Sequence, residues 1–256
     1  MNYVQFGNTG LSVSRLCIGT GTHGWGHRSQ QTALGIDGLA SLLTHGYDLG
    51  VNFWDAADQY GSHPHVAEAM KRVGRDNVVV ATKTTAKRGG QIRRDIERFL
   101  KELETDILDI VLLHSVSSAN WPKRYESAMA ALAEAQEKGY VRAVGFSCHS
   151  LGALRTAVNT DWPEVILVRI NHAGVNMDGQ PNEVVPVIEQ LHGQGKAIYG
   201  MKVLGCGQLH DVERALRWVL DLGTVHALSI GTSSDRELEE NVAIMERVAP
   251  SRGVQG

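Results

Sequence analysis

Short apolar runs alternate with amphipathic stretches along the whole chain, and this alternation limits the possible folds more than any other feature. Eight such cycles follow one another, with no linker rich in proline or serine between them. Each apolar run is almost continuously apolar, as is typical of parallel strands buried on both faces. We predict strands over residues 15–19, 51–55, 78–83, 107–114, 141–147, 165–170, 197–201 and 227–230.

The amphipathic stretches are predicted to be helices. Gly139 and Gly195 follow two of them as expected C-caps, and Ser234-Asp235 precedes the last as an N-cap candidate. The predicted helices cover residues 31–49, 64–73, 91–104, 122–138, 151–159, 182–194, 211–222 and 236–248. Eight β-then-α cycles in 256 residues fit an α/β fold of the (β/α)8 TIM-barrel type, whose chemistry lies at the carboxyl ends of the strands.

The first residues predict a β-hairpin. Residues 3–6 and 11–13 alternate in polarity around the turn Gly7-Asn8-Thr9-Gly10. We expect this hairpin to close the bottom of the barrel. With no linker in sight, residues 1–256 are interpreted as one domain.

A doubly wound open sheet is the competing architecture. The segment from Gly19 to Gly24 reads G-x-G-x-x-G directly after the first strand. In a dinucleotide-binding fold the third glycine opens a helix, and an acid closes the second strand about 20 residues later. Here the helix begins only near Gln31, and Asp55 follows too late, so we interpret the glycine pattern as a coincidence.

Composition excludes several classes of partner. The chain has 43% hydrophobic and 21% charged residues, and 25 basic against 28 acidic side chains, without a long run of one sign. Nucleic acid is therefore not an expected partner. No apolar stretch approaches the roughly 20 residues of a membrane span. Three cysteines without a C-x-x-C pair indicate neither a disulfide framework nor a zinc ribbon, so we expect a cytoplasmic protein.

Titratable residues end three consecutive strands. Asp55, Lys83 and His114 are the last residues of predicted strands two, three and four, and Tyr60 follows Asp55 on the next loop. Carboxyl ends of parallel strands meet at one rim, so we expect these four side chains to converge. Each of them alone is more often structural than catalytic, and only their joint placement indicates a site.

Such a cluster can protonate a carbonyl oxygen. A tyrosine with a reference pKa of about 10 is a poor acid at neutral pH, but a neighbouring ammonium favours the phenolate. Lys83 would supply that charge, Asp55 would pair with Lys83, and His114 would bind the substrate oxygen. General acid catalysis of this kind contributes roughly 10²–10⁴-fold as a hydride arrives at the carbon.

These motifs resemble the aldo-keto reductase superfamily. The resemblance rests on D-A-A-D-Q-Y-G from Asp55, A-T-K ending at Lys83 and L-L-H-S at His114, and it covers nearly the whole chain. It implies a barrel that reduces a small-molecule aldehyde or ketone with a nicotinamide cofactor and no metal. Tyr60 would then be the general acid, Lys83 and Asp55 its tuning pair, and His114 the substrate-orienting group.

The resemblance also implies cofactor contacts. They fall after strand one, at the ends of strands two and five to seven, and around the last strand and helix. The positions are Gly21, Thr22, His23, Asp55, Ser147, Arg169, Met201, Lys202, Leu204, Gly205, Gly207, Gly231, Thr232, Ser233, Arg236, Glu240 and Asn241.

Four of the positions near the nicotinamide depart from the family pattern. Cys148 replaces an asparagine, Arg169 a glutamine, Met201 an aromatic residue and Lys202 a serine. Sulfur can still pack on a ring face. At the 2′-phosphate site the usual lysine is missing, but Arg236 stands beside hydroxyls and a helix N-terminus. We therefore expect NADP(H) to be favoured over NAD(H).

The substrate pocket is less well defined by sequence. The chain ends a few residues after the last predicted helix, so we expect a compact family member with an open pocket that lacks the long C-terminal tail of many relatives. Trp25, Trp54 and Trp121 fall on rim loops or strand ends and are expected to wall the pocket.

Other functions compete with the reductase interpretation. His63-Pro64-His65 is an H-x-H that could bind a metal in a barrel hydrolase, but it starts a helix rather than ending a strand. A short-chain dehydrogenase needs tyrosine and lysine four residues apart, a spacing that this chain lacks. Two alternatives stay open: a cofactor-binding regulatory or sensor barrel without turnover, and an NAD(P)-assisted epimerase or lyase that uses the same site.

Overall fold

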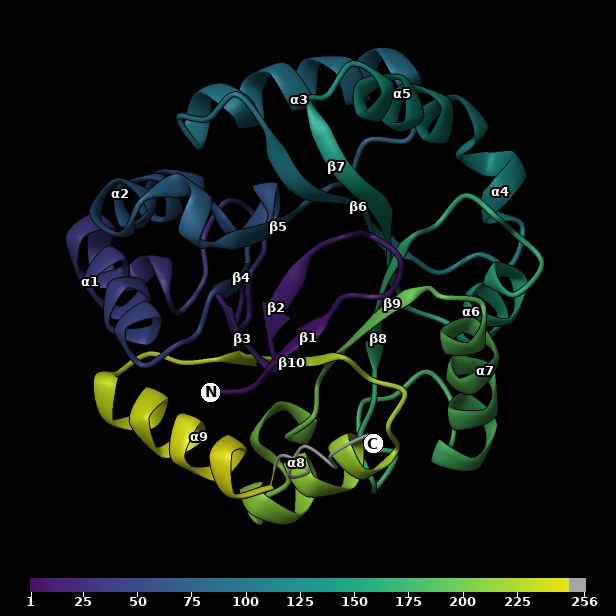
Figure 1. Cartoon of the computed structure of the whole chain (residues 1–256). Helices are drawn as coiled ribbons and strands as arrows, with labels where there is room; N and C mark the ends of the chain where they lie inside the picture. Colours follow the sequence, from purple (N-terminus) through teal and green to yellow (C-terminus); the bar gives the residue numbers. More distant parts are fainter. Residues whose placement is uncertain (249–256) are drawn as a thin grey trace, which may run out of the picture.

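The computed structural model describes residues 1–248, and its centre is a closed barrel of eight parallel strands (Figure 1). Strands adjacent in sequence are adjacent in the barrel, and β10 closes the ring by pairing with β3. The predicted (β/α)8 barrel is thereby confirmed, and the open-sheet alternative is excluded. The strands are β3 (Leu16–Gly19), β4 (Phe53–Asp55), β5 (Val79–Thr84), β6 (Leu108–Val116), β7 (Val141–Cys148), β8 (Val165–Arg169), β9 (Ala197–Met201) and β10 (Ala227–Gly231).

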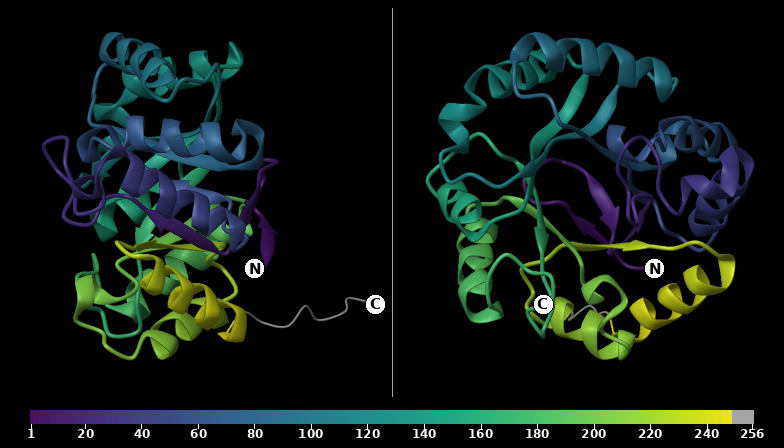
Figure 2. Two further views of the ribbon diagram at one scale, coloured as in Figure 1. Left: turned by 90° about the vertical axis from the view of Figure 1, so that its left-hand side faces the viewer. Right: turned by 180° about the vertical axis from the view of Figure 1, so that it is seen from behind.

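Helices surround the barrel and cover its outer surface (Figures 1 and 2). They are α1 (Gly35–Asp48), α2 (His63–Val73), α3 (Gly89–Glu102), α4 (Trp121–Arg124), α5 (Glu126–Glu137), α6 (Leu151–Ala157), α7 (Pro181–Gly193), α8 (Val212–Asp221) and α9 (Asp235–Val248). Short 3₁₀ turns are η1 (Thr32–Leu34), η2 (Asp58–Tyr60), η3 (Arg75–Asn77) and η4 (Gly205–Gly207).

One predicted helix is divided in two. The stretch 122–138 forms α4 and α5, because Tyr125 between them has φ −111° and ψ 14°, outside the helical range. The expectation about the end of the chain concerns residues 249–256, which lie outside the described residues.

The N-terminal hairpin closes one end of the barrel, as predicted. Strands β1 (Tyr3–Gln5) and β2 (Ser12–Ser14) pair antiparallel. They cross the end of the barrel that faces the viewer in Figure 1. The side chain of Phe6 is fully buried, with ring centroids 5.3 Å from Phe53 and 5.9 Å from Tyr199. The hairpin therefore fills the end at which the strands begin and leaves the opposite end open.

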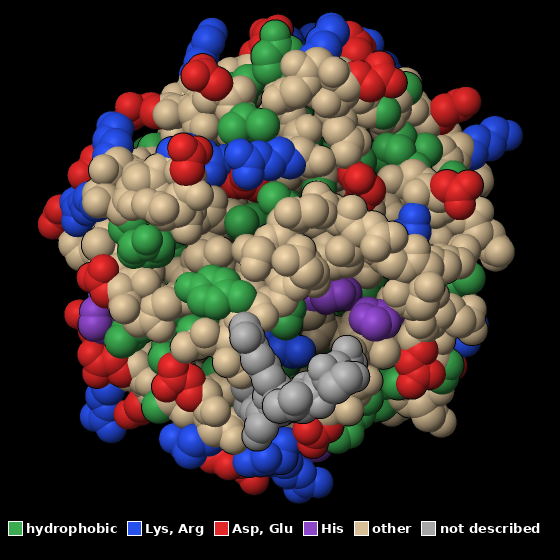
Figure 3. Space-filling model, in the orientation of Figure 1, with side chains coloured by type: hydrophobic (Ala, Val, Ile, Leu, Met, Phe, Trp, Pro, Cys, Tyr) green, Lys and Arg blue, Asp and Glu red, His purple; other side chains and the backbone are tan. Residues whose placement is uncertain are grey.

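Two apolar layers hold the fold together. One fills the barrel interior with small and medium side chains such as Ala81, Leu112 and Leu167, and the other lies between the strands and the outer helices. Charged side chains on the hairpin face stand mostly around its edge, over the helices (Figure 3). Within residues 1–248 no helix combines the length and apolarity that a membrane crossing requires.

Replacing Phe6 by alanine tests whether the N-terminal hairpin stabilises the barrel. Phe→Ala in a packed core costs about 3–5 kcal/mol, so the Phe6→Ala variant should unfold at markedly lower urea concentration. Leu34→Ala removes a side chain that is 40% exposed and serves as the control. Equal unfolding midpoints for the two variants would contradict a stabilising role of the hairpin.

Candidate active site

The site residues lie on the inward-facing side of the strands, at their carboxyl ends. Side chains alternate along a strand, so a residue two positions beyond a buried interior residue faces the same way. Asp55 follows Phe53, Lys83 follows Ala81, and both preceding residues belong to the interior layer. His114, Arg169 and Met201 follow interior residues of β6, β8 and β9 in the same way. The polar strand ends predicted from sequence therefore meet at the open mouth of the barrel.

A buried ion pair lies at the centre of the mouth. Lys83 Nζ is 2.7 Å from each carboxylate oxygen of Asp55 and 2.8 Å from the carbonyl oxygen of Ala56. The exposed fractions of the two side chains are 0% and 6%. Burial alone would lower the pKa of Lys83, but the Asp55 carboxylate together with Tyr60 and Cys17 outweighs this effect, and the pKa is raised. The ammonium therefore stays charged.

Tyr60 packs against this pair from the turn η2. Lys83 Nζ is 4.9 Å from the centroid of the Tyr60 ring. The other side of the ring is covered by the loop after β3, where a Cβ at Gly21 or Gly24 would collide with ring carbons. The glycine pattern of this loop, which the sequence left without a role, lets the backbone close over the phenol.

Burial dominates the pKa of Tyr60. It raises this pKa above the ordinary value for tyrosine, and the Asp55 charge adds to the rise. The Lys83 ammonium lowers the pKa, as expected from the sequence, but does not cancel the loss of hydration of a phenolate in this dry position. Tyr60 is consequently a protonated phenol at neutral pH.

His114 faces the same mouth as a neutral imidazole. Burial, with the nearby Lys83 charge, lowers its pKa to about 3. Its ring centroid lies 5.6 Å from that of Tyr60. The Nδ1 atom is buried without a hydrogen-bond partner, so a proton placed there would be unsatisfied, and we assign the proton to Nε2. His114 can then donate a hydrogen bond.

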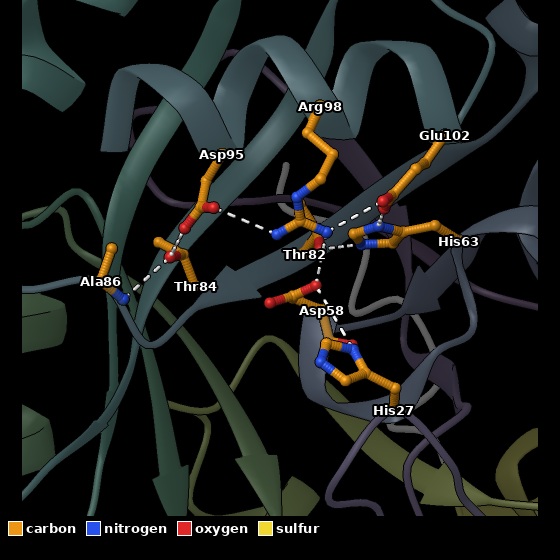
Figure 4. Close-up of polar contacts among 9 residues, drawn as sticks. All are labelled: His27, Asp58, His63, Thr82, Thr84, Ala86, Asp95, Arg98 and Glu102. Carbon is orange, nitrogen blue, oxygen red and sulfur yellow. Dashed lines mark hydrogen bonds and ion pairs between the residues drawn. The ribbon is translucent and has the colours of Figure 1, made fainter. Parts of the chain in front are cut away.

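A polar network behind the mouth holds η2 in place (Figure 4). Arg98 from α3 donates to Asp58 of η2 at 2.7 Å and to Glu102 at 2.9 Å. Glu102 also lies 2.6 Å from His63 Nδ1, whose Nε2 is 2.7 Å from Thr82 of β5. The turn that carries the phenol is thus tied to a strand and to a helix.

An open cavity of about 390 Å³ runs from the mouth toward the loop after β9. Its lining contains one carboxylate, Asp55, whose charge is already paired with Lys83. Ten of the residues predicted from sequence line it: Gly21, Thr22, His23, Asp55, Tyr60, Met201, Lys202, Leu204, Gly207 and Gly231. Apolar side chains form much of the walls, and the polar groups among them include hydroxyls, backbone groups and the Lys202 ammonium, which suit a ligand with both apolar and anionic parts.

Two further predicted contacts have internal partners. Ser147 is buried, and its hydroxyl oxygen accepts the N–H of Ser115 at 2.7 Å, in the irregular end of β6 beside His114. Arg169 donates to Asp178 at 3.1 Å and faces the mouth. Cys148 lies buried next to them, and burial raises the pKa of its thiol to about 12.

The contacts predicted around α9 lie farther along the rim. Thr232 is buried, and the Ser233 N–H donates to the carboxylate of Glu237 at 2.9 Å. Arg236 pairs with Glu240 at 2.9 Å, and its side chain is 88% exposed. Two more predicted residues do not line the cavity. They are Asn241 of α9 and Gly205 of the loop after β9.

Of the three predicted tryptophans, only Trp25 is at the mouth. It is 60% exposed, and its ring centroid is 6.2 Å from that of His114. Trp54 and Trp121 are fully buried in the layer between strands and helices, and the Trp121 indole donates to the Ala153 carbonyl. The expectation that these two wall the pocket is wrong, because both indoles are enclosed in that layer and do not reach the mouth.

Some residues at the site were missed. Tyr199 donates to Asp55, and Gln31 bonds both Thr22 and Ser233 and so links two rim loops. Only the alternation along β9 could have indicated Tyr199. The cavity lining also includes Gln30, Cys206 and Ser229.

The metal-hydrolase alternative has no support here. His63 is buried in its bonds to Glu102 and Thr82. Among residues 1–248 no group of three histidine, cysteine, aspartate or glutamate side chains could hold a metal ion.

Fold and site together are those of a (β/α)8-barrel protein with ionisable side chains gathered at its open mouth. A model of the aldo/keto reductase family matches residues 15–214. The chain belongs to the aldo-keto reductase family.

Known relatives agree with this assignment. Aldo-keto reductase YhdN of Bacillus subtilis is 30% identical over 176 residues, which are 61% of this chain and 50% of YhdN, so the match spans about half of that relative. L-galactose dehydrogenase of Arabidopsis thaliana is 22% identical over 93% of this chain and 86% of its own. An aldo-keto reductase from Bacillus halodurans shares the fold, with a TM-score of 0.82, 20% identity and coverage of 98% and 93%.

Breaking the central ion pair from one side should be costly. Lys83→Met leaves a buried carboxylate uncompensated and should lower the free energy of unfolding by about 3–5 kcal/mol. The double variant Asp55→Asn/Lys83→Met should be closer to the wild type.

Lys71→Met, which removes a lysine that is 52% exposed, is the matched control and should cost at most about 1 kcal/mol. Urea unfolding measures the wild type and the three variants. A single Lys83 variant as stable as the double variant would contradict the buried-pair interpretation.

Proposed function

We propose that this protein reduces an aldehyde or ketone to an alcohol with NADPH or NADH. The observation that carries the proposal is the convergence of Tyr60, His114 and the Asp55–Lys83 pair beside an open, carboxylate-poor cavity. Membership of the aldo-keto reductase family supports the same reaction class.

The residues present suit a nicotinamide dinucleotide. Lys202 supplies a cation for its phosphates, and the glycine turn Gly205–Gly207 exposes backbone beside the cavity. Met201 can pack on the nicotinamide ring, and Arg169 offers donors to its carboxamide. When bound, the cofactor supplies a hydride.

The side chains of the mouth handle the proton. The substrate carbonyl oxygen accepts hydrogen bonds from the Tyr60 hydroxyl and from His114 Nε2, which orients it and stabilises the developing negative charge. Tyr60 then gives its proton to that oxygen. The Lys83 ammonium, held by Asp55, stabilises the phenolate that remains.

The family resemblance and Arg236 support a preference for NADP(H). The 2′-phosphate would lie at the N-terminus of α9, where Arg236 stands and where Glu237 already accepts from the Ser233 N–H. The phosphate must compete with that carboxylate. The preference is therefore expected to be modest.

Tyr60→Phe tests the proton donor. The variant should bind cofactor as the wild type does but turn over a carbonyl substrate roughly 10²–10⁴ times more slowly, because the ring is kept and only the acidic proton is lost. A panel of aldehydes and ketones with saturating NADPH measures this effect. Undiminished turnover by the variant would rule out Tyr60 as the acid, and a wild type inactive on the whole panel would favour the regulatory alternative.

Fluorescence titration with NADPH and NADH tests the cofactor preference. Arg236→Gln should weaken NADPH binding by roughly three- to tenfold and leave NADH unchanged, because an exposed guanidinium contact is of moderate strength. Glu237→Gln should strengthen NADPH binding, since it removes the competing charge. If both variants alter NADH and NADPH alike, the 2′-phosphate does not lie at this helix end.

A further inference from the structure

Tyr199 carries a hydroxyl into an otherwise apolar layer. It lies on β9, is fully buried and belongs to the interior layer of the barrel. Its ring centroid is 5.3 Å from that of Phe53 and 5.9 Å from that of Phe6 of the hairpin. A phenylalanine would fill this space without the cost of burying a polar group. The hydroxyl therefore calls for an explanation.

Among residues 1–248, the Asp55 carboxylate is the one hydrogen-bond partner of that hydroxyl. Tyr199 donates to Asp55 Oδ1 at 2.9 Å, across 144 positions of sequence. Burial raises the pKa of Tyr199 well above its usual range, and the Asp55 charge adds to the effect. The group therefore stays protonated and acts only as a donor.

The Lys83 ammonium is held by the Asp55 carboxylate and by the Ala56 carbonyl. Its three close acceptors are the two Asp55 oxygens and the Ala56 carbonyl oxygen. The charge of Lys83 lies 4.9 Å from the centroid of the Tyr60 ring and favours the phenolate. The position of that charge depends on the position of the Asp55 carboxylate. Asp55 lies on β4 and Lys83 on β5, and the Tyr199 hydroxyl holds the carboxylate from a third strand, β9.

We propose that Tyr199 is a positioning residue of the active site, which holds the Asp55 carboxylate, and through it the Lys83 ammonium, beneath Tyr60. This inference rests on the proposed reductase function for its catalytic consequence. The Tyr199 proton also offsets part of the negative charge of Asp55. Since that charge disfavours the Tyr60 phenolate, loss of the hydroxyl should make Tyr60 a weaker acid.

A stability cycle tests the contact without any turnover. Tyr199→Phe is made in the wild type and in the Asp55→Asn/Lys83→Met background, and the four proteins are unfolded in urea. A hydrogen bond to a charged group is stronger than one to a neutral group, so the change should raise the unfolding equilibrium constant roughly tenfold more in the wild type. An equal effect in both backgrounds overturns the inference.

Kinetics test the consequence for catalysis. Tyr199→Phe should lower kcat roughly three- to tenfold, with the KM for the carbonyl and the affinity for NADPH unchanged. The alkaline limb of the kcat profile, where Tyr60 loses its proton, should move to higher pH. A purely structural role would not move that limb.

Tyr125→Phe is the matched control, because Tyr125 is also buried and its hydroxyl makes no hydrogen bond within residues 1–248. An active Tyr199→Phe enzyme with unchanged kcat and an unmoved alkaline limb overturns the positioning role. If the wild type shows no carbonyl turnover, the proposed function fails, and the stability cycle alone decides whether Tyr199 holds the pair.

Discussion

The ion pair between Asp55 and Lys83 is the interaction on which the geometry of the mouth depends. Two opposite charges in a dry interior are tolerated only when their hydrogen-bonding capacity is met, and here the Ala56 carbonyl and the Tyr199 hydroxyl complete it. The pair therefore ties β4, β5 and β9 together at one level of the barrel. Tyr60 stacks on the ammonium, and His114 completes the mouth beside that ring.

The two ends of the barrel have different tasks. At the hairpin end, Phe6 and its aromatic neighbours fill the interior and stabilise the fold. At the open end, packing is used to hold polar groups still: glycines let a loop close over Tyr60, and the Arg98 network fixes the turn below it. The open end is consequently braced by packing and hydrogen bonds around Tyr60 and hollow beside it.

Much of this arrangement could be predicted from sequence. The alternation of apolar and amphipathic stretches predicted the barrel. The polar residues at three strand ends predicted the cluster at the mouth, since the carboxyl ends of parallel strands lie together. Cofactor positions followed only from the family resemblance. The prediction for Trp54 was wrong because one position along a strand decides whether a side chain points into the barrel or away from it. The prediction for Trp121 was wrong because this residue begins the helix α4 and packs in the layer between helices and strands.

What the sequence determined by itself is local: the alternation that forms the barrel, and which strands end in a carboxylate, an amine or an imidazole. Closure of the barrel decided the rest. It brought Tyr199 to Asp55 across 144 positions, and it buried Tyr60 deeply enough that desolvation raises its pKa despite Lys83. Hydration and long-range contact depend on the whole surroundings of a group, and those surroundings exist only once distant strands have met.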